Sequence, residues 1–193
     1  MTPFEYIFPL VSVIIGLAVA DLAKSVHRLL RNRKKVYWDW LPLTTALLVL
    51  LTVLNVWWGF YSLRDETYYQ NLIGFIPLVT QLILLFFVSA AVLPDKIQKE
   101  GLNLQRFYKK NSPYFWSLYA AFIFVIITQQ SIYLIIAGID PLTSIIDQIP
   151  NILIFSVFIC LVFIRSRLFH AVVVIALFLL FITKWAGMNL GAM

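Results

Sequence analysis

A few uncharged polar residues interrupt the long apolar stretches of this 193-residue chain, and they are the side chains best able to bind something. Inside a membrane, amides and hydroxyls either line a solute or ion pathway or hydrogen-bond one helix to another. The residues are Ser12, Asn55, Thr80, Gln81, Gln129 and Gln130. Four of them, one from each of four predicted helices, fall about 9–13 Å below the outer boundary at a rise of about 1.5 Å per residue. The sequence therefore predicts an outward-facing polar cavity or, alternatively, a ring of structural hydrogen bonds worth on average about 0.6 kcal/mol per pair.

Asp21 is the acidic residue placed furthest inside an apolar stretch. Lys24, one helical turn later, lies on the same face and can pair with it. A carboxylate without that partner would be a proton or cation site at the cytoplasmic mouth of a pathway. Both interpretations of Asp21 and Lys24 stay open at this point.

The two histidines, His27 and His170, both fall near the inner boundary. Two imidazoles that face each other can ligate one haem iron, whereas interfacial structural histidines are the alternative. The single cysteine excludes an internal disulfide, and the sequence has no zinc, phosphate-loop or hydrolase motif. Apart from the haem considered for the two histidines, we expect no cofactor and no metal, and nothing in the sequence supports an enzyme.

The composition indicates which elements must position these side chains. The chain is 62% hydrophobic and 12% charged, with a mean hydropathy of +0.89, whereas a soluble domain is roughly 25% charged. A soluble chain of this size cannot bury so much apolar surface in one core. The sequence thus predicts an integral membrane protein and excludes a soluble enzyme, a secreted disulfide scaffold and a disordered regulator.

Six apolar runs are candidates to cross about 30 Å of hydrocarbon. They cover residues 4–23, 41–61, 72–93, 114–137, 149–164 and 168–182. The last two runs are short and could lengthen to about Leu142 and Met188, with Pro150 kinking the fifth helix and Lys184 snorkelling. Arg165-Ser166-Arg167 between the two runs has no Gly or Pro to end a helix. We expect a hairpin there, because one continuous helix would push the last apolar run into water. The predicted fold class is all-α, with six transmembrane helices in one domain over residues 1–193.

The basic residues predict the orientation of these helices. Six lie between positions 24 and 40, five lie between 94 and 113, and two are Arg165 and Arg167; only Arg64 and Lys184 lie elsewhere. Basic segments stay in the cytoplasm, so both termini are expected outside. This sidedness also accounts for the net charge of +6, and no nucleic-acid partner is expected.

Some of these basic residues form a candidate surface for anionic lipid headgroups or for an acidic cytosolic partner. This basic surface consists of Arg28, Arg31, Arg33, Lys34, Lys35, Lys109 and Lys110.

The chain opens with Phe4-Glu5-Tyr6, continues through Gly16-Leu17 and Arg28-Leu29-Leu30-Arg31, and carries Trp57-Trp58 in its second apolar run. This stretch, residues 4–58, resembles a loose group of uncharacterised bacterial multi-pass proteins. The resemblance implies a location in the bacterial inner membrane and brings no activity with it.

Three functions fit these observations. The first is a small channel or transporter-like protein with the polar residues as its lining and Asp21 and Lys24 at its inner mouth; it would be a homo-oligomer, because 22.3 kDa is little protein to enclose a path alone. The second is a non-catalytic membrane subunit or sensor that recruits a cytosolic partner through the basic surface. The third is a haem or quinone redox subunit that uses His27 and His170.

Overall fold

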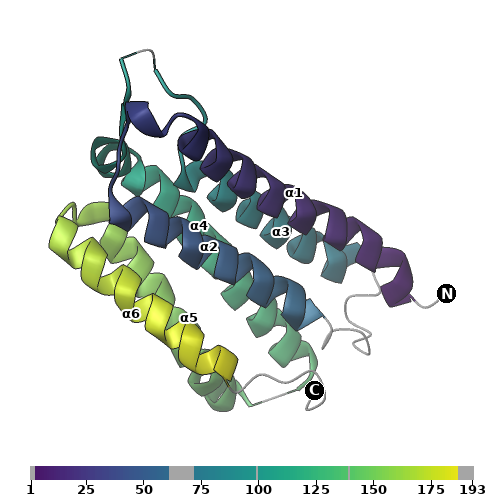
Figure 1. The fold of residues 1–193 in the computed structure, drawn as a ribbon. Helices are drawn as coiled ribbons and strands as arrows, with labels where there is room; N and C mark the ends of the chain where they lie inside the picture. Colours follow the sequence, from purple (N-terminus) through teal and green to yellow (C-terminus); the bar gives the residue numbers. More distant parts are fainter. Residues whose placement is uncertain (1–2, 61–71, 99, 139, 187–193) are drawn as a thin grey trace.

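The computed structural model describes residues 3–60, 72–98, 100–138 and 140–186, and these form a bundle of α-helices (Figure 1). The helices are α1 (Pro3–Arg31), α2 (Trp40–Gly59), α3 (Leu72–Val92), α4 (Leu104–Ile136), α5 (Pro141–Phe163) and α6 (Arg167–Ala186). The first five are long and apolar enough to cross a membrane, whereas the apolar part of α6 is shorter, Arg167–Thr183. The chain is therefore a multi-helix protein whose helices have the length and hydropathy of membrane-spanning segments.

Two pairs of helices flank a central pair (Figure 1). α2 contacts α1, α3, α4 and α6, while α4 packs against α3 on one side and α5 on the other. The start of α1 and the end of α6 lie at one end of the bundle. The α1–α2 and α3–α4 connections and the α5–α6 turn lie at the other end, which we call the basic end because most of the Lys and Arg residues lie there.

Three helices extend well beyond their apolar runs. α1 continues to Arg31, α4 begins at Leu104 rather than at residue 114, and α5 begins at Pro141 rather than at residue 149. N-caps explain the two early starts. The Asn103 side chain accepts a hydrogen bond from the Arg106 N–H at 2.9 Å, and the Asp140 carboxylate accepts from the Leu142 N–H at 3.1 Å. Hydropathy does not predict helical turns that carry charged residues.

An aromatic cluster fixes α4 against α2 and α5. Trp116 is fully buried and stacks on Tyr119, with ring centroids 5.8 Å apart and planes 8° apart. Phe158 of α5 lies 5.2 Å from the Trp116 ring, and the Tyr119 hydroxyl hydrogen-bonds the Thr52 hydroxyl of α2. The centre of the bundle is therefore packed with rigid rings rather than open.

A short strand pair ties the two long connections together at the basic end. In β1 (Val36–Tyr37) and β2 (Leu102–Asn103), Val36 pairs with Leu102 and Tyr37 with Asn103, in parallel. Gly101, just before β2, has φ +105°, and a Cβ built on it would lie 2.9 Å from the Lys35 carbonyl oxygen. Only glycine adopts that backbone region readily and allows this approach.

Replacing Gly101 by Ala is expected to lower the free energy of unfolding by about 1–3 kcal/mol, because the new Cβ meets backbone and the φ becomes strained. Thermal unfolding in detergent measures the change. The matched control is Gly16→Ala on α1, where nothing described lies within 4 Å of the added Cβ, so it should be neutral or stabilise the helix by up to about 1 kcal/mol. Equal melting temperatures for the two variants would contradict the prediction.

Candidate functional site

Four of the polar residues singled out in the sequence line one cavity of about 360 Å³ between α2, α3 and α4. Asn55 comes from α2, Gln81 from α3, and Gln129 and Gln130 from α4. Each lies in the half of its helix away from the basic end, which is why one cavity can collect all four. We call this space the amide cavity.

The remaining lining residues are apolar, small or aromatic, with Gly59 and Tyr133 among them. Within the described part of the chain the lining carries no formal charge. A site of this kind recognises a ligand through hydrogen bonds and shape rather than through charge.

Ser12 and Thr80 do not line the amide cavity. Thr80 is exposed, and its hydroxyl donates to the Ile76 carbonyl of its own helix at 2.9 Å. Successive residues of a helix point about 100° apart, so Gln81 faces inward while its neighbour Thr80 faces outward. Ser12 lies on α1, which contributes nothing to the lining. Counting residues along a helix cannot separate these residues from the lining set, whereas rotation about the helix axis does.

Asn55 has an unused acceptor: its Oδ1 is buried and has no hydrogen-bond partner among the described residues. An unpaired buried acceptor costs roughly 1–3 kcal/mol. Buried polar atoms in native structures are mostly paired, so an exception calls for an explanation such as an unseen ligand or water. Asn55 is the residue of the amide cavity that is most clearly set up to receive a donor.

Next to the cavity, amides join α4 to α5. Asn151 Nδ2 donates to Gln130 Oε1 at 3.1 Å. Gln148 Nε2 donates to the Ser131 hydroxyl at 2.8 Å and to the Ile127 carbonyl at 3.2 Å. This is interhelical hydrogen bonding of the structural kind. The sequence reasoning missed Gln148 and Asn151, although a Gln and an Asn three residues apart share one face of α5 and mark a polar seam.

The amide cavity is closed toward the basic end. Thr52 lies one turn nearer that end than Asn55, and its hydroxyl bonds the buried Tyr119 hydroxyl of α4. Leu85 of α3 and Phe122 of α4, also nearer that end, are almost fully buried. The described residues thus form a cavity with a floor rather than an open pore.

The two candidates for an inner mouth, Asp21 and Lys24, do not form an ion pair among the described residues. Asp21 Oδ2 is buried without a hydrogen-bond partner in the described part of the chain, and Lys24 is exposed. Neither lines the amide cavity. The structure therefore separates these two residues from the polar set.

The structure does not bring the two histidines of the haem hypothesis together. His27 lies on α1 and His170 is buried on α6, at opposite sides of the bundle (Figure 1). Both ring nitrogens of His170 are engaged: Nδ1 lies 3.0 Å from the Tyr108 hydroxyl and Nε2 lies 2.8 Å from the Ile164 carbonyl. Among the described residues, no group of three or more His, Cys, Asp or Glu side chains is placed to hold a metal ion.

The basic surface divides into separate parts in the structure. Arg28 donates to the Pro94 carbonyl at 3.4 Å and to the Asp95 carbonyl, and lies 3.9 Å from the Asp95 carboxylate. The basic residues at the end of α1 and in the α1–α2 connection are Arg31, Arg33, Lys34 and Lys35, and all four are exposed. Lys110 lines a hollow of about 710 Å³ beside the strand pair, and Lys109 lines a smaller pocket of about 190 Å³.

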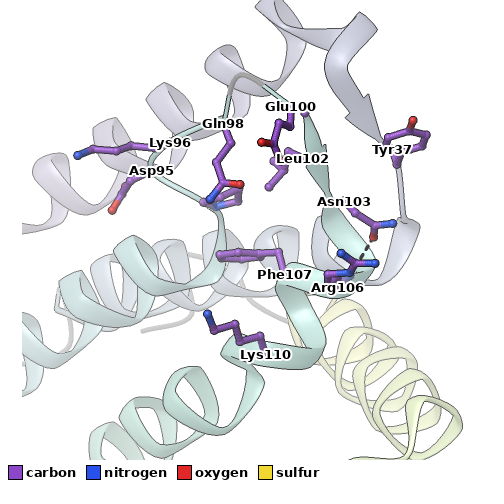
Figure 2. Close-up of a pocket in the computed structure, with 12 residues that line it drawn as sticks. Tyr37, Asp95, Lys96, Gln98, Glu100, Leu102, Asn103, Arg106, Phe107 and Lys110 are labelled. Atoms are coloured by element: carbon purple, nitrogen blue, oxygen red, sulfur yellow. Dashed lines mark hydrogen bonds between the residues drawn. The ribbon is translucent and has the colours of Figure 1, made fainter.

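Figure 2 shows the larger hollow, with Phe107 across its base, Lys110 below it and Glu100 and Gln98 above. It is shallow and mixed in charge, since Asp95 and Glu100 share it with Lys96, Arg106 and Lys110. Whether this part of the surface receives lipid or protein stays a prediction.

Taken together, the fold and the site define a class: a polytopic helical membrane protein with an uncharged, amide-lined cavity closed on the basic side. Comparison with protein-family models, with curated proteins and with solved structures finds no match for the chain. The inference about function therefore rests on the geometry of the site.

Proposed function

We propose that this chain is a small transporter-like protein that binds an uncharged polar solute in the amide cavity. The observation that carries the proposal is the convergence of Asn55, Gln81, Gln129 and Gln130 from three helices on one cavity. Its volume of about 360 Å³ lies at the small end of ligand pockets, roughly 300–1,000 Å³. Carboxamides supply both donors and acceptors, which suits a solute rich in hydroxyl or amide groups.

The orientation that we propose places the amide cavity in the outer half of the membrane. All six helices cross, both termini lie outside, and the basic end faces the cytoplasm of a bacterial inner membrane. The 20 residues of α6 extend about 30 Å as a helix, enough to match the hydrocarbon core. The cavity then opens outward in this conformation, as the first state of an alternating-access cycle does.

The packing below the cavity favours a transporter over a constantly open channel. The Thr52–Tyr119 hydrogen bond and the buried ring of Phe122 must separate before a solute passes inward. A homo-oligomer remains part of the proposal, because one chain of 22.3 kDa supplies few helices to enclose a path.

Solute flux into liposomes that contain the full chain tests this proposal. Stopped-flow light scattering follows the entry of urea, glycerol and glucose as a size series, and a dye reports potassium entry. We expect at least one neutral solute to enter severalfold faster than in protein-free liposomes, and Gln81→Leu with Gln129→Leu to return that rate to background. The matched control combines Thr80→Val with Thr128→Val, since both hydroxyls bond to carbonyls of their own helix at exposed positions.

Neutral solutes that all enter at the protein-free rate would overturn the proposal, and so would full flux in the double Gln variant. Faster entry of potassium alone would overturn the assignment to an uncharged solute.

The stability of Asn55→Leu distinguishes a site from structural hydrogen bonding. If Asn55 serves a ligand, removal of its unpaired buried oxygen should raise the free energy of unfolding of the empty protein by about 1 kcal/mol. If the amides are structural, the same variant should lose about 0.6 kcal/mol. Thermal unfolding in detergent without added solute separates the two outcomes.

A further inference from the structure

A second pocket, of about 190 Å³, lies at the basic end. It forms where α2 and α4 begin and where the α5–α6 turn passes over them. Its polar lining includes Asp39, Tyr108, Lys109, Arg165, Arg167 and His170. We call it the inner pocket.

Contacts within the wall stabilise the inner pocket and leave Asp39, the one carboxylate among its described lining residues, fully paired. Asp39 Oδ1 accepts from the Leu41 N–H at 2.9 Å, and Asp39 Oδ2 lies 2.7 Å from Arg167 Nη2. The Asp39 side chain is 8% exposed, so its charge is largely removed from water and balanced by Arg167.

A hydrogen-bonded chain forms the back of the same pocket. Trp116 Nε1 donates to the Tyr108 hydroxyl at 3.3 Å, and that hydroxyl lies 3.0 Å from His170 Nδ1. These hydrogen bonds and the Asp39–Arg167 ion pair hold α2, α4 and the α5–α6 turn in place around the pocket. Because the pocket is already ordered, ligand binding costs less conformational entropy.

The charges that remain are positive. Lys109 and Arg165 form no ion pair within the described part of the chain, and the Arg167 side chain is half exposed. Three cations against one paired carboxylate leave a net positive pocket in which guanidinium and ammonium groups can converge on one anion. Arginine and lysine together are the usual recognition set for phosphate.

The residues next to the lining residues in the sequence are exposed apolar and aromatic side chains that can contact the acyl chains of a lipid. Phe163 and Leu168 enclose the Arg165 turn and are exposed, as are Trp38 and Trp40 on either side of Asp39. Tryptophans and apolar side chains beside basic residues are typical of the level where headgroups meet acyl chains. We propose that the inner pocket binds the phosphate of an anionic lipid headgroup. A free phosphate ion would use the cations but not the apolar surroundings.

Lipid binding to the purified full chain in detergent tests the site without reference to flux. Native mass spectrometry compares phosphatidic acid, phosphatidylglycerol and phosphatidylcholine, and thermal unfolding with inorganic phosphate forms a separate arm. Lys109→Gln with Arg165→Gln should weaken binding of the anionic lipids by roughly tenfold to thirtyfold, since each basic residue near a headgroup contributes appreciably. The matched control, Lys96→Gln with Arg106→Gln, removes the same charge from the larger hollow (Figure 2) and should change binding less than about threefold.

Several outcomes would overturn the inner pocket as a lipid-phosphate site. Equal binding of phosphatidylcholine would do so, as would equal losses in the two double variants. Protection by inorganic phosphate equal to that by phosphatidic acid would assign the pocket to a free anion instead. The melting temperature without lipid verifies that both variants fold, because Lys109 and Arg165 are exposed and make no ion pair in the described residues.

Discussion

Replacing Trp116 by Ala is expected to lower the free energy of unfolding by about 3 kcal/mol or more. The side chain is fully buried, so its removal leaves a cavity at the junction of α4 with α5 that rigid neighbouring rings cannot fill. The change also removes the stack on Tyr119 and the donor to the Tyr108 hydroxyl. Both effects act on the floor of the amide cavity and on the wall of the inner pocket, so solute flux and lipid binding should fall together.

Thermal or denaturant unfolding in detergent measures this loss, with Trp57→Ala as the matched control. Trp57 is 43% exposed on α2, and its loss should cost less than about 1 kcal/mol. Phe158→Leu, which trims one partner of Trp116, should give an intermediate effect of about 1–2 kcal/mol. A Trp116→Ala variant as stable as Trp57→Ala would show that the aromatic cluster does not organise the bundle.

The Ser166→Cys variant is expected to react with a membrane-impermeant maleimide from the cytoplasmic side only. Ser166 lies in the exposed turn between α5 and α6, which the proposed orientation places inside together with Arg165 and Arg167. The experiment uses a Cys160→Ser background, because the single native cysteine is exposed on α5. The expected contrast is all or none, since a charged reagent does not cross the bilayer.

The paired variant is Ala137→Cys, exposed where α4 ends at the other end of the bundle, and it should react only from outside. A reporter fused after Met193 should likewise lie outside. A cytoplasmic reporter, with position 166 still inside, would mean that α6 does not cross and that the chain has five spans. Reaction of the Ser166→Cys variant from outside would reverse the orientation and place the amide cavity on the cytoplasmic side.

The sequence predicts the helices well wherever hydropathy alone defines them. α2 and α3 match the predicted runs within a few residues, because both are apolar nearly from end to end. The continuation of α1 over residues 24–31 follows from its amphipathic pattern and not from hydropathy, and the helical start at residues 104–113 is missed, because these turns are charged and amphipathic. α5 begins before its apolar run, near the longer limit of residue 142, because Asp140 caps it and Pro141 starts it, a signal that does not depend on hydropathy.

The sequence also identifies the residues of the amide cavity by type and depth, but it cannot select among them. Thr80 and Gln81 are adjacent and equally deep, yet only Gln81 lines the cavity. Gln148 lies just outside the apolar run 149–164 although it is buried and bonded to α4. Depth follows from counting residues along one helix, whereas facing direction depends on the neighbouring helices.

By itself, the sequence determines that this chain is an all-helical membrane protein with its basic residues gathered at one end. Only the tertiary structure decides that four amides share a cavity, that His170 and His27 are far apart, and that Asp39 before α2 meets Arg167 at the start of α6. The physical reason is that hydropathy and charge act on each segment separately, through the bilayer and its surfaces. Contacts between helices depend on how each helix is rotated about its axis, and packing of side chains such as Trp116 against distant partners sets that rotation.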